Sequence, residues 1–403
     1  MAGSFGGLEI ARSGLYISQK ALDITSKNIA NANTVGYTRQ RVVSTPAVFN
    51  MGVQFTTVEQ IRDKFLDVQY RNELNQSGEW SVKTEALTMM EDFLQEPSDT
   101  GINQAVGEFF NAIQQMSKQP ETKEFRTQVR QNAINLTETL QYQYQKFTEI
   151  QQNQNESIKG TVSQINTLAE NIRALNAQIV KLGTNGEETN ELNDQRNNLI
   201  DQLTELVDIR VTEQSDKTVS IEIGGKTLVE GNTAHKLTTT QDKENPIADE
   251  PMLDTVRWEE DGEQTDIIGG KLKGYMDIRD GNGVLETDDP KAMGVPYFIA
   301  KFNVFAKAIA EAVNTIHTQG YTQPNESNGN VSTSGHDFFV AGDGQTEVTA
   351  KNIKISDAIM SDVYNIAASD ETLNALNMGN KKIISQISDL RDSKIKVDIG
   401  GIT

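Results

Sequence analysis

The sequence from Ile158 to Leu182 is IKGTVSQINTLAENIRALNAQIVKL, and its apolar residues have a helical period. Isoleucine recurs every seven residues and leucine follows three residues behind, so both types lie on one face of an α-helix. The isoleucines are Ile158, Ile165, Ile172 and Ile179, and the leucines are Leu168, Leu175 and Leu182. No proline lies between residues 121 and 182. This predicts one helix about 90 Å long, at about 1.5 Å per residue.

A second helix follows after a short turn. Residues 183–186 contain two glycines, and beyond them leucines recur at helical spacing, at Leu192, Leu199, Leu203 and Leu206. A turn of this length between two helical patterns predicts an antiparallel hairpin. The first helix is rich in Gln and Asn, as in residues 151–155, and we interpret these residues as a solvated surface without added charge.

The N-terminal region has a different helical pattern, with apolar residues on two sides. One series consists of Leu8, Leu15, Leu22 and Ile29, and the other of Ile10, Ile17 and Ile24. Because the series are offset by two residues, about 200° around a helix, this helix is expected to be sandwiched between two partners. A buried core helix is the alternative. The polar, turn-prone Asn31, Asn33 and Gly36 that follow favour partners from far along the chain or from other molecules.

Strand patterns occupy two further regions. Residues 41–58 alternate loosely and contain a proline and a glycine, which is typical of an extended linker or of short strands. After residue 208 the apolar period changes to two, as in residues 219–223, which predicts a small β-rich domain. Helical spacing returns near residue 296. The sequence therefore predicts a mainly α fold with an inserted β domain (α+β), elongated and multidomain, with a long antiparallel helical bundle.

The composition limits the class of protein. The chain has 403 residues, with 37 Lys and Arg against 57 Asp and Glu, a net charge of −20 and 36% hydrophobic residues. At about 100–200 residues per domain, two to four domains are expected. No run of basic residues exceeds a lysine pair, so nucleic acid is excluded as the main partner. The absence of cysteine excludes disulfides, thiolate metal sites and cysteine nucleophiles.

Neither a membrane span nor a signal peptide is indicated. No window of the sequence approaches about 18 consecutive apolar residues. The first residues, MAGSFGGLEIARSGLY, lack a basic segment followed by a continuous apolar one. We therefore expect no membrane insertion and, if the protein is exported, no cleaved signal peptide.

No group of residues has the spacing of a catalytic or metal site. The three histidines, His235, His317 and His336, lack the spacing of a metal site or a catalytic triad. His317 ends a helix, where a cation favours the macrodipole, so we interpret it as a capping residue rather than a catalytic one. Residues 241–266 hold ten acidic residues against two basic ones, a composition that allows a calcium site but favours a solvated loop. We assign no catalytic residue, no metal and no cofactor.

A motif follows the N-terminal helix. The stretch from Ser26 to Gln40, SKNIANANTVGYTRQ, resembles the N-terminal signature of bacterial flagellar axial proteins, the group of rod, hook and hook-associated proteins. In such a helix end Asn28 and Asn31 can cap and bridge, and Gly36 allows a tight exit. The candidate assembly signature consists of Asn28, Ile29, Ala30, Asn31, Asn33, Thr34, Gly36, Tyr37, Arg39 and Gln40. The candidate packing residues of the axial core are Leu8, Ile10, Leu15, Ile17, Leu22 and Ile24.

Later segments separate the members of this group. Rod and hook proteins generally lack the Gln- and Asn-rich helical hairpin. Residues 191–203, ELNDQRNNLIDQL, resemble the returning helix of the hook-associated protein 1 family. Residues 270–280, 313–321 and 366–369 are similar to the same family in the same order, so the resemblance spans nearly the whole chain.

This resemblance implies a structural adaptor at the junction between the flagellar hook and filament. Such a protein is exported unfolded through the flagellar secretion channel and is extracellular, in the bacterial flagellum. The implied partners are other copies of the chain in a ring, the hook protein, the next hook-associated junction protein, and the flagellar export apparatus with its chaperone. The alternatives are another axial protein (hook or distal rod), a cell-surface coiled-coil adhesin, and an enzyme that uses the acidic residues of the β domain.

The patterns and the resemblance together give the expected domains. They are an axial-core helix (1–40), an extended linker (41–60), the first part of a helical bundle (61–208), a β-rich inserted domain (209–290), and a return to the bundle (291–403) with a short β-like segment near 338–356. The family normally ends with a long apolar helix that pairs with the N-terminal one, whereas this chain ends at Gly400-Gly401-Ile402-Thr403. We therefore expect a truncated chain whose first helix is loose or packs on another copy.

Overall fold

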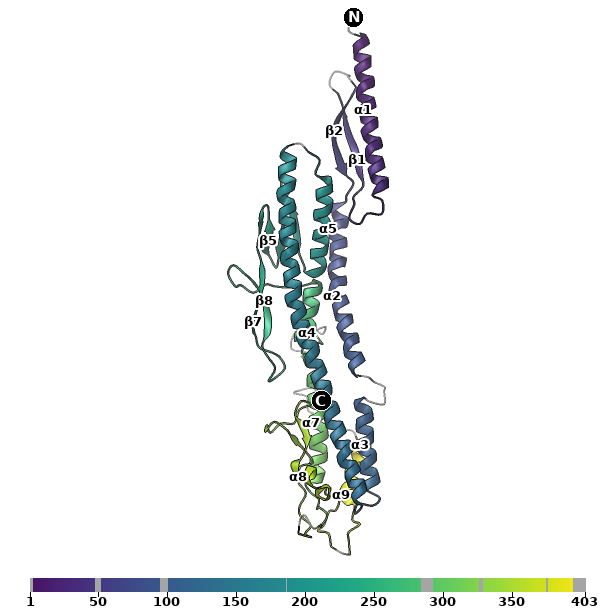
Figure 1. Ribbon diagram of the computed structural model, residues 1–403, viewed down its shortest axis with the longest axis vertical. Coiled ribbons are helices and arrows are strands. Elements are labelled where there is room, and N and C mark those ends of the chain that lie inside the picture. Colours follow the sequence, from purple (N-terminus) through teal and green to yellow (C-terminus); the bar gives the residue numbers. More distant parts are fainter. Residues whose placement is uncertain are drawn as a thin grey trace. The chain divides into compact units, whose positions relative to one another are not determined.

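The computed structural model describes residues 3–47, 52–94, 101–185, 187–283, 293–325, 329–374 and 376–393. Figure 1 shows the ribbon with its elements labelled. The chain forms two compact units, each assembled from separate segments. The first unit contains residues 1–83, 155–244 and 252–276, and the second contains residues 84–154, 245–251 and 277–403.

The first unit begins with a helix and a hairpin, α1 (Gly3–Ala30), β1 (Gln40–Pro46) and β2 (Val53–Gln60). Residues 41–58, for which an extended linker or short strands were expected, thus form strands within the described ranges. The helices that follow are the first part of α2 (Lys64–Leu94), the second part of α4 (Lys123–Thr184), and α5 (Asn190–Leu206).

The β part of the first unit lies between α5 and α6 (Gly270–Asp280) in the sequence. One antiparallel sheet has the order β3-β4-β5-β6, and β7 pairs with β8. The strands are β3 (Arg210–Glu213), β4 (Val219–Ile223), β5 (Lys226–Glu230), β6 (Thr233–Ala234), β7 (Leu237–Lys243) and β8 (Leu253–Trp258).

The heptad face of α4 supplies the core of the first unit, as predicted. Ile158, Ile165 and Ile172 are fully buried, and α5 lies beside this part of α4 as the returning arm of the hairpin (Figure 1). The core residues from α5 and the strands are Ile200, Leu203, Leu206, Val219, Ile221, Ile223, Leu228, Val229, Leu237, Val256 and Trp258. A helical face with a period of seven therefore packs on both a helix and a sheet.

Three of the five amide side chains at residues 151–155 of α4 are not solvated. Gln151, Gln154 and Asn155 are almost fully buried, so the interpretation of residues 151–155 is wrong at these three positions. Gln151 Nε2 donates to Asn245 Oδ1 and to the Arg279 carbonyl, both at 3.0 Å, and Asn155 Oδ1 accepts from the Asp254 N–H of β8 at 3.0 Å. An amide group carries both a donor and an acceptor, so it can bond to other protein groups in place of water, including those of a strand. A helix can therefore dock on a strand through its asparagines.

Two asparagines of α4 make this contact with both polar atoms of the amide. Asn166 Oδ1 accepts a hydrogen bond from the Leu237 N–H at 2.9 Å, and Asn166 Nδ2 donates to the Leu237 carbonyl at 2.8 Å. Asn176 contacts Val219 in the same way, at 3.2 Å and 3.0 Å. Because the two asparagines are about three helical turns apart, one face of α4 holds the starts of both β7 and β4.

The second unit has helices around a short pair of strands, with an aromatic core. The Phe109 ring centroid lies 5.9 Å from that of Phe338 and 5.7 Å from that of Phe339. The elements are α3 (Ile102–Met116), α7 (Val295–His317), β9 (Phe339–Ala341), β10 (Ile353–Ile355), α8 (Asp357–Ser361), α9 (Lys382–Asp389), and the 3-10 helices η3 (Val363–Asn365) and η4 (Leu390–Asp392), together with parts of α2 and α4. The predicted mainly α fold with inserted β structure is confirmed.

Helix α6 lies inside the stretch that was expected to be β-rich. Its glycines argue against a helix, since glycine costs about 1 kcal/mol relative to alanine in a helix interior. They are required by close packing, because a Cβ at Gly270 would lie 2.6 Å from the Leu206 carbonyl and one at Gly274 2.8 Å from the Glu79 carbonyl. The proposed domain boundaries stay a prediction, and the chain end at residues 400–403 lies outside the described residues.

His317 does not act as a cation at the end of α7, so the capping interpretation is wrong. Its ring is fully buried, its Nε2 accepts a hydrogen bond from the Ala367 N–H at 2.8 Å, and its Nδ1 donates to the His336 carbonyl. Burial, with smaller effects of His336 and Arg126, lowers the pKa of His317 to about 4. The neutral ring therefore joins three segments of the second unit.

This arrangement predicts a loss of stability in acid. The pKa of His317 is lower in the folded chain than in the unfolded one, so its contribution is complete above about pH 6.5 and disappears as the pH falls toward 4. The shift corresponds to about 3 kcal/mol. We expect His317→Gln to be less stable than the wild-type chain near neutral pH, with the difference shrinking toward pH 4. Urea unfolding of both proteins between pH 4 and pH 7.5 measures this, and parallel stability curves would contradict it.

Candidate assembly interface

One apolar stripe of α1 is exposed along the length of the helix. Leu8, Leu15, Leu22 and Ile29 keep 68%, 62%, 66% and 73% of their surface accessible. A single exposed leucine is common on a protein surface, but four apolar residues at heptad spacing form a continuous apolar strip. Within the described residues this strip is a candidate interface for another helix or another copy of the chain.

The other stripe of α1 is covered by the hairpin of β1 and β2. Ile24 is 5% exposed, Ile17 is half-buried, and Ile10 at the free end of the series is 44% exposed. The Tyr16 and Phe55 rings meet edge to face, with centroids 6.4 Å apart. In Figure 1 the hairpin lies along α1. The chain thus supplies one of the two expected partners from residues just beyond the helix.

The signature closes the end of α1 with hydrogen bonds centred on Asn28. Asn28 Nδ2 donates to the Gln40 carbonyl, and Asn28 Oδ1 accepts from the Gln40 N–H and from the Tyr37 hydroxyl, all three at 2.9 Å. Gln40 is buried at the start of β1. One asparagine therefore fixes the angle at which the chain leaves the helix and enters the hairpin.

The remaining signature residues form the turn itself. Asn31 Nδ2 donates to the Lys27 carbonyl at 3.0 Å, and the Thr34 hydroxyl donates to Asn31 Oδ1 at 3.3 Å. Gly36 has a φ of 80°, which disfavours any residue with a Cβ. The exposed members of the signature are Ile29, Ala30, Asn33, Thr34, Gly36 and Arg39. Gln40 is buried and Asn28 and Tyr37 are half-buried, and we call these three hydrogen-bonded residues the clasp.

Helix α5 holds this turn from outside the signature. Asp194 is 7% exposed, and its two carboxylate oxygens accept from the Thr38 N–H at 3.0 Å and from Gln60 Nε2 at 2.7 Å. Asn190 Nδ2 donates to the Val58 carbonyl at 3.0 Å. The end of α1 and the hairpin are thus tied to one face of α5, and we call these contacts the α5 seat.

Gly36 also packs closely on the α5 seat. A Cβ at this position would lie 3.3 Å from Asn198 Cβ. The sequence assigned the tight exit to Gly36 but did not identify Asp194, Asn190, Asn198 or Gln60 as residues of this site. The signal was present in the segment 191–203, which resembled the family without a physical role for its polar residues. The partners are 132 to 162 residues away in the sequence, which hides the contact from any local pattern.

Asp194→Ala should loosen the signature. The change removes two hydrogen bonds to a charged acceptor, each worth about 1.5–3 kcal/mol. We expect a decrease of about 2 kcal/mol in the protection of the Thr38 and Gln40 amides against hydrogen exchange. Asp201→Ala is the matched control, because Asp201 lies on the same helix but pairs with Arg71 of α2, at 2.8 Å. Equal loss of protection in both variants would show that the α5 seat does not hold the signature.

The acidic segment 241–266, considered above as a calcium site, contains carboxylates that are buried or paired with a cation. Among the described residues no group of three or more histidine, aspartate and glutamate side chains is placed to hold a metal ion. Within the acidic segment 241–266, Asp254 is buried in β8 and Asp242 pairs with Arg257 at 2.8 Å. The expected solvated loop is therefore in part a pair of strands. In the same described ranges no helix combines the length and the apolar character needed to cross a bilayer.

Comparisons with known proteins give one family. A family model described as "Flagellar hook-associated protein FlgK helical domain" matches residues 87–339, and one described as "Flagella basal body rod protein" matches residues 8–38. The solved structure of the flagellar hook junction protein FlgK from Burkholderia pseudomallei has a similar fold, with a TM-score of 0.56 and 23% identity over 68% of this chain and 46% of that one.

Three curated relatives share the name flagellar hook-associated protein 1. Flagellar hook-associated protein 1 of Bacillus subtilis is 32% identical, over 94% of this chain and 80% of the relative. The proteins of that name from Salmonella typhimurium and Escherichia coli are 28% and 29% identical, over 82% and 85% of this chain, and the matches span 59% and 61% of those proteins. The family model over residues 87–339 and a relative 32% identical over 94% of this chain show that the chain belongs to the flagellar hook-associated protein 1 family.

Proposed function

We propose that this chain is a structural subunit of the junction between the flagellar hook and filament, assembled as a ring through α1. The single observation that carries the proposal is the exposed strip of Leu8, Leu15, Leu22 and Ile29 on a helix whose other face is already covered. Burial of a leucine stabilises by about 1.5–3 kcal/mol. Four such residues on each subunit therefore favour association through this strip.

The clasp at the end of α1 supports this role. A subunit in a ring must present its interface in the same orientation at every position, because a closed ring repeats one contact. Asn28 and Asp194 hold the chain at the exit of α1 through hydrogen bonds within the first unit. These hydrogen bonds fix the orientation of α1, and with it the orientation of the strip, relative to the rest of the first unit.

The proposed partners follow from the resemblance to the flagellar axial proteins. We infer contacts with other copies of the chain, the hook protein and the next hook-associated junction protein, with export by the flagellar apparatus and a chaperone and a final location in the extracellular flagellum. The family consists of structural flagellar proteins, and the proposed function is structural rather than enzymatic. The match to rod proteins covers residues 8–38 alone, whereas the helical-domain match covers 87–339, which favours a junction protein over a rod or hook protein.

Hook ends test the proposal directly. Isolated hooks from the organism that encodes the chain, stripped of their junction proteins, are incubated with the purified chain and then labelled with gold-conjugated antibody. We expect label at the distal end of each hook, where the junction forms. Label along the hook shaft, or none at all, would contradict assignment to the junction.

A further inference from the structure

A ring of more than two copies needs two different surfaces on each subunit. Every contact in such a ring is head to tail, so a surface of one copy meets a different surface of the next. The strip of Leu8, Leu15, Leu22 and Ile29 is one of these surfaces in the proposed function. The second surface must also be exposed and apolar, because it has to match the strip.

Exposed apolar side chains gather a second time at the first half of α2, in the same unit as α1. Each keeps about half or more of its surface accessible, and they are Ile61, Phe65, Leu66, Val68, Tyr70 and Trp80. Elsewhere in the described part of the first unit after residue 60, the exposed large apolar side chains are Val180, Met252 and Ile268, on three separate segments. The first half of α2 therefore carries the apolar surface that most resembles an interface.

The opposite face of α2 is already used within the chain. Asn75 Nδ2 donates to the Thr204 carbonyl at 2.9 Å, and a Cβ at Gly78 would lie 2.4 Å from the Glu205 carbonyl. Helix α2 thus packs closely on α5 along this face (Figure 1). Trp80 follows two residues after Gly78, about 200° around the helix. The contact with α5 therefore holds α2 in place and leaves the side of Trp80 to solvent.

The exposed side of α2 has the seven-residue spacing of the strip on α1. Leu66 and Trp80 are fourteen residues apart, with Glu73 midway between them, and Tyr70 and Ser77 lie four residues after Leu66 and Glu73. All five are exposed, and we call them the α2 face. It extends over about 21 Å, as do three successive leucines of the strip. Two helices with this common period can pack along a shared seam.

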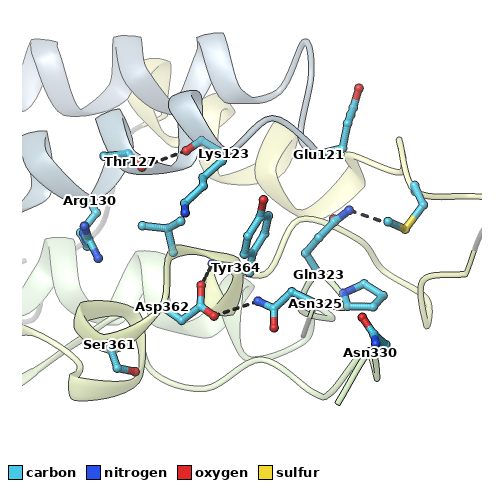
Figure 2. A pocket seen from close by; sticks show the side chains of 13 residues that line it. Glu121, Lys123, Thr127, Arg130, Gln323, Asn325, Asn330, Ser361, Asp362 and Tyr364 are labelled. Atoms are coloured by element: carbon cyan, nitrogen blue, oxygen red, sulfur yellow. Dashed lines mark hydrogen bonds between the residues drawn. The ribbon is translucent and has the colours of Figure 1, made fainter. Parts of the chain in front are cut away.

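The polar groove of the second unit is a poor match for the strip. It lies beside the first turns of α4 and has a volume of about 740 Å³ (Figure 2). Its lining carries both signs of charge, with Lys123 and Arg130 on α4 and with Glu121 and Asp362. Leucines placed there would remove these charges from water without pairing them, which is unfavourable.

We propose that the strip on α1 of one copy packs against the α2 face of the next copy. This contact rests on the proposed function, because it names the surface that receives the strip in the ring. Each subunit then gives its strip to one neighbour and its α2 face to the other, as a head-to-tail ring requires.

The charges on the two surfaces are complementary. The exposed residues four positions after each leucine of the strip are Arg12, Gln19 and Ser26, so this line has one charge, a positive one. The α2 face also has one charge, the negative Glu73. Arg12 pairs with Glu9 of its own helix at 2.7 Å, but an exposed pair of this kind contributes little. Arg12 is therefore available to Glu73 of the next copy.

Cross-linking at hook ends tests this contact, and the chain suits the method because it contains no cysteine. Gln19→Cys marks the strip and Ser77→Cys marks the α2 face, both at exposed positions. The two variants are mixed, added to isolated hooks stripped of their junction proteins, and treated with a short bismaleimide. We expect a cross-linked dimer from the mixture and none from either variant alone, since a head-to-tail contact brings unlike positions together.

Thr167→Cys is the matched control, at an exposed position of α4 outside the α2 face. Mixed with Gln19→Cys, it should give at least tenfold less dimer. Equal yields from the two mixtures, or a dimer from Gln19→Cys alone, would overturn the contact. Gold labelling of the same hooks reports the junction role separately. Label without the dimer overturns this contact alone, whereas absence of label overturns the junction role and the contact with it.

Charge reversal checks the contact without a cross-linker. Glu73→Arg would bring two cations together and Arg12→Glu two anions, so each should lower the labelling of hook ends at least tenfold. The combined variant Arg12→Glu/Glu73→Arg should restore it. Both side chains are exposed, so thermal unfolding should stay the same in all three proteins. Full labelling by the single variants, or no recovery in the combined one, would show that the α2 face does not receive the strip.

Discussion

Replacing Asn176 with alanine is expected to lower the free energy of unfolding of the first unit by about 3 kcal/mol. Asn176 Nδ2 donates to the carbonyls of Val219 and Gly231, at 3.0 and 3.2 Å. Asn176 Oδ1 accepts from Arg196 Nη1 at 2.9 Å and from the Val219 N–H. Each buried group left without a partner costs about 1–3 kcal/mol.

The guanidinium of Arg196 makes the loss larger. Arg196 is almost fully buried, and burial lowers its pKa to about 10. Among the described residues its Nε already has no hydrogen-bond partner. Without Asn176, the guanidinium would keep the Lys217 carbonyl at 2.8 Å and Asn193 Oδ1 at 3.2 Å as its acceptors. The charge would then be solvated less well inside the protein, which disfavours the folded state.

Asn171→Ala is the matched control for this measurement. Asn171 lies on the same helix five residues earlier and is exposed. Its replacement should change stability by less than about 0.5 kcal/mol, as for most surface positions. Urea unfolding followed by circular dichroism measures both variants. A loss below about 1 kcal/mol for Asn176→Ala would show that water replaces the amide and that α4 docks on the strands mainly through its isoleucines.

The helices were predictable because their signal is local. The heptad of Ile158, Ile165 and Ile172 requires only the period of the α-helix, and the buried face of α4 follows it. The role of Asn176 was not predictable in this way. An asparagine on a helix has the same local pattern whether it contacts water or a strand edge, and its partner Val219 is 43 residues away.

The signature was predicted as a turn, and its internal bonds could be expected from the residue types. Tyr37 and Gln40 lie nine and twelve residues after Asn28, so residue chemistry and spacing were sufficient. Asp194 was missed because its partner Thr38 is 156 residues away, which no period can reveal. Asp194 lies in the segment 191–203 that resembles the family, but the sequence does not show that this carboxylate is buried.

The two stripes of α1 also show what the sequence alone could not predict. Their offset predicted two partners, but it could not tell which stripe the chain itself would cover. The hairpin covers Ile24 because only a short turn separates it from the helix, and the strip that contains Leu15 and Leu22 stays exposed. The structure therefore shows which of the two stripes is available to a partner, and this allows a more specific prediction than the sequence did.

Leu15→Glu combined with Leu22→Glu should abolish assembly while leaving the isolated chain folded. Both side chains are almost two-thirds exposed, so the unfolding free energy should change by less than about 0.5 kcal/mol. In an assembled ring each leucine would lose about 1.5–3 kcal/mol of burial, and each glutamate would enter an apolar contact. A total near 4 kcal/mol corresponds to about a thousandfold weaker association.

The control for this prediction is Leu15→Met combined with Leu22→Met, which keeps the strip apolar and the volume similar, since such exchanges usually cost less than about 1.5 kcal/mol. Gold labelling of hook ends should be retained with the methionine pair and lost with the glutamate pair, at equal thermal stability of the two proteins. If the glutamate pair still labels hook ends, the strip of α1 is not the assembly interface. The ring contact must then be carried by another surface of the first or second unit, and the clasp at Asn28 would serve the fold alone.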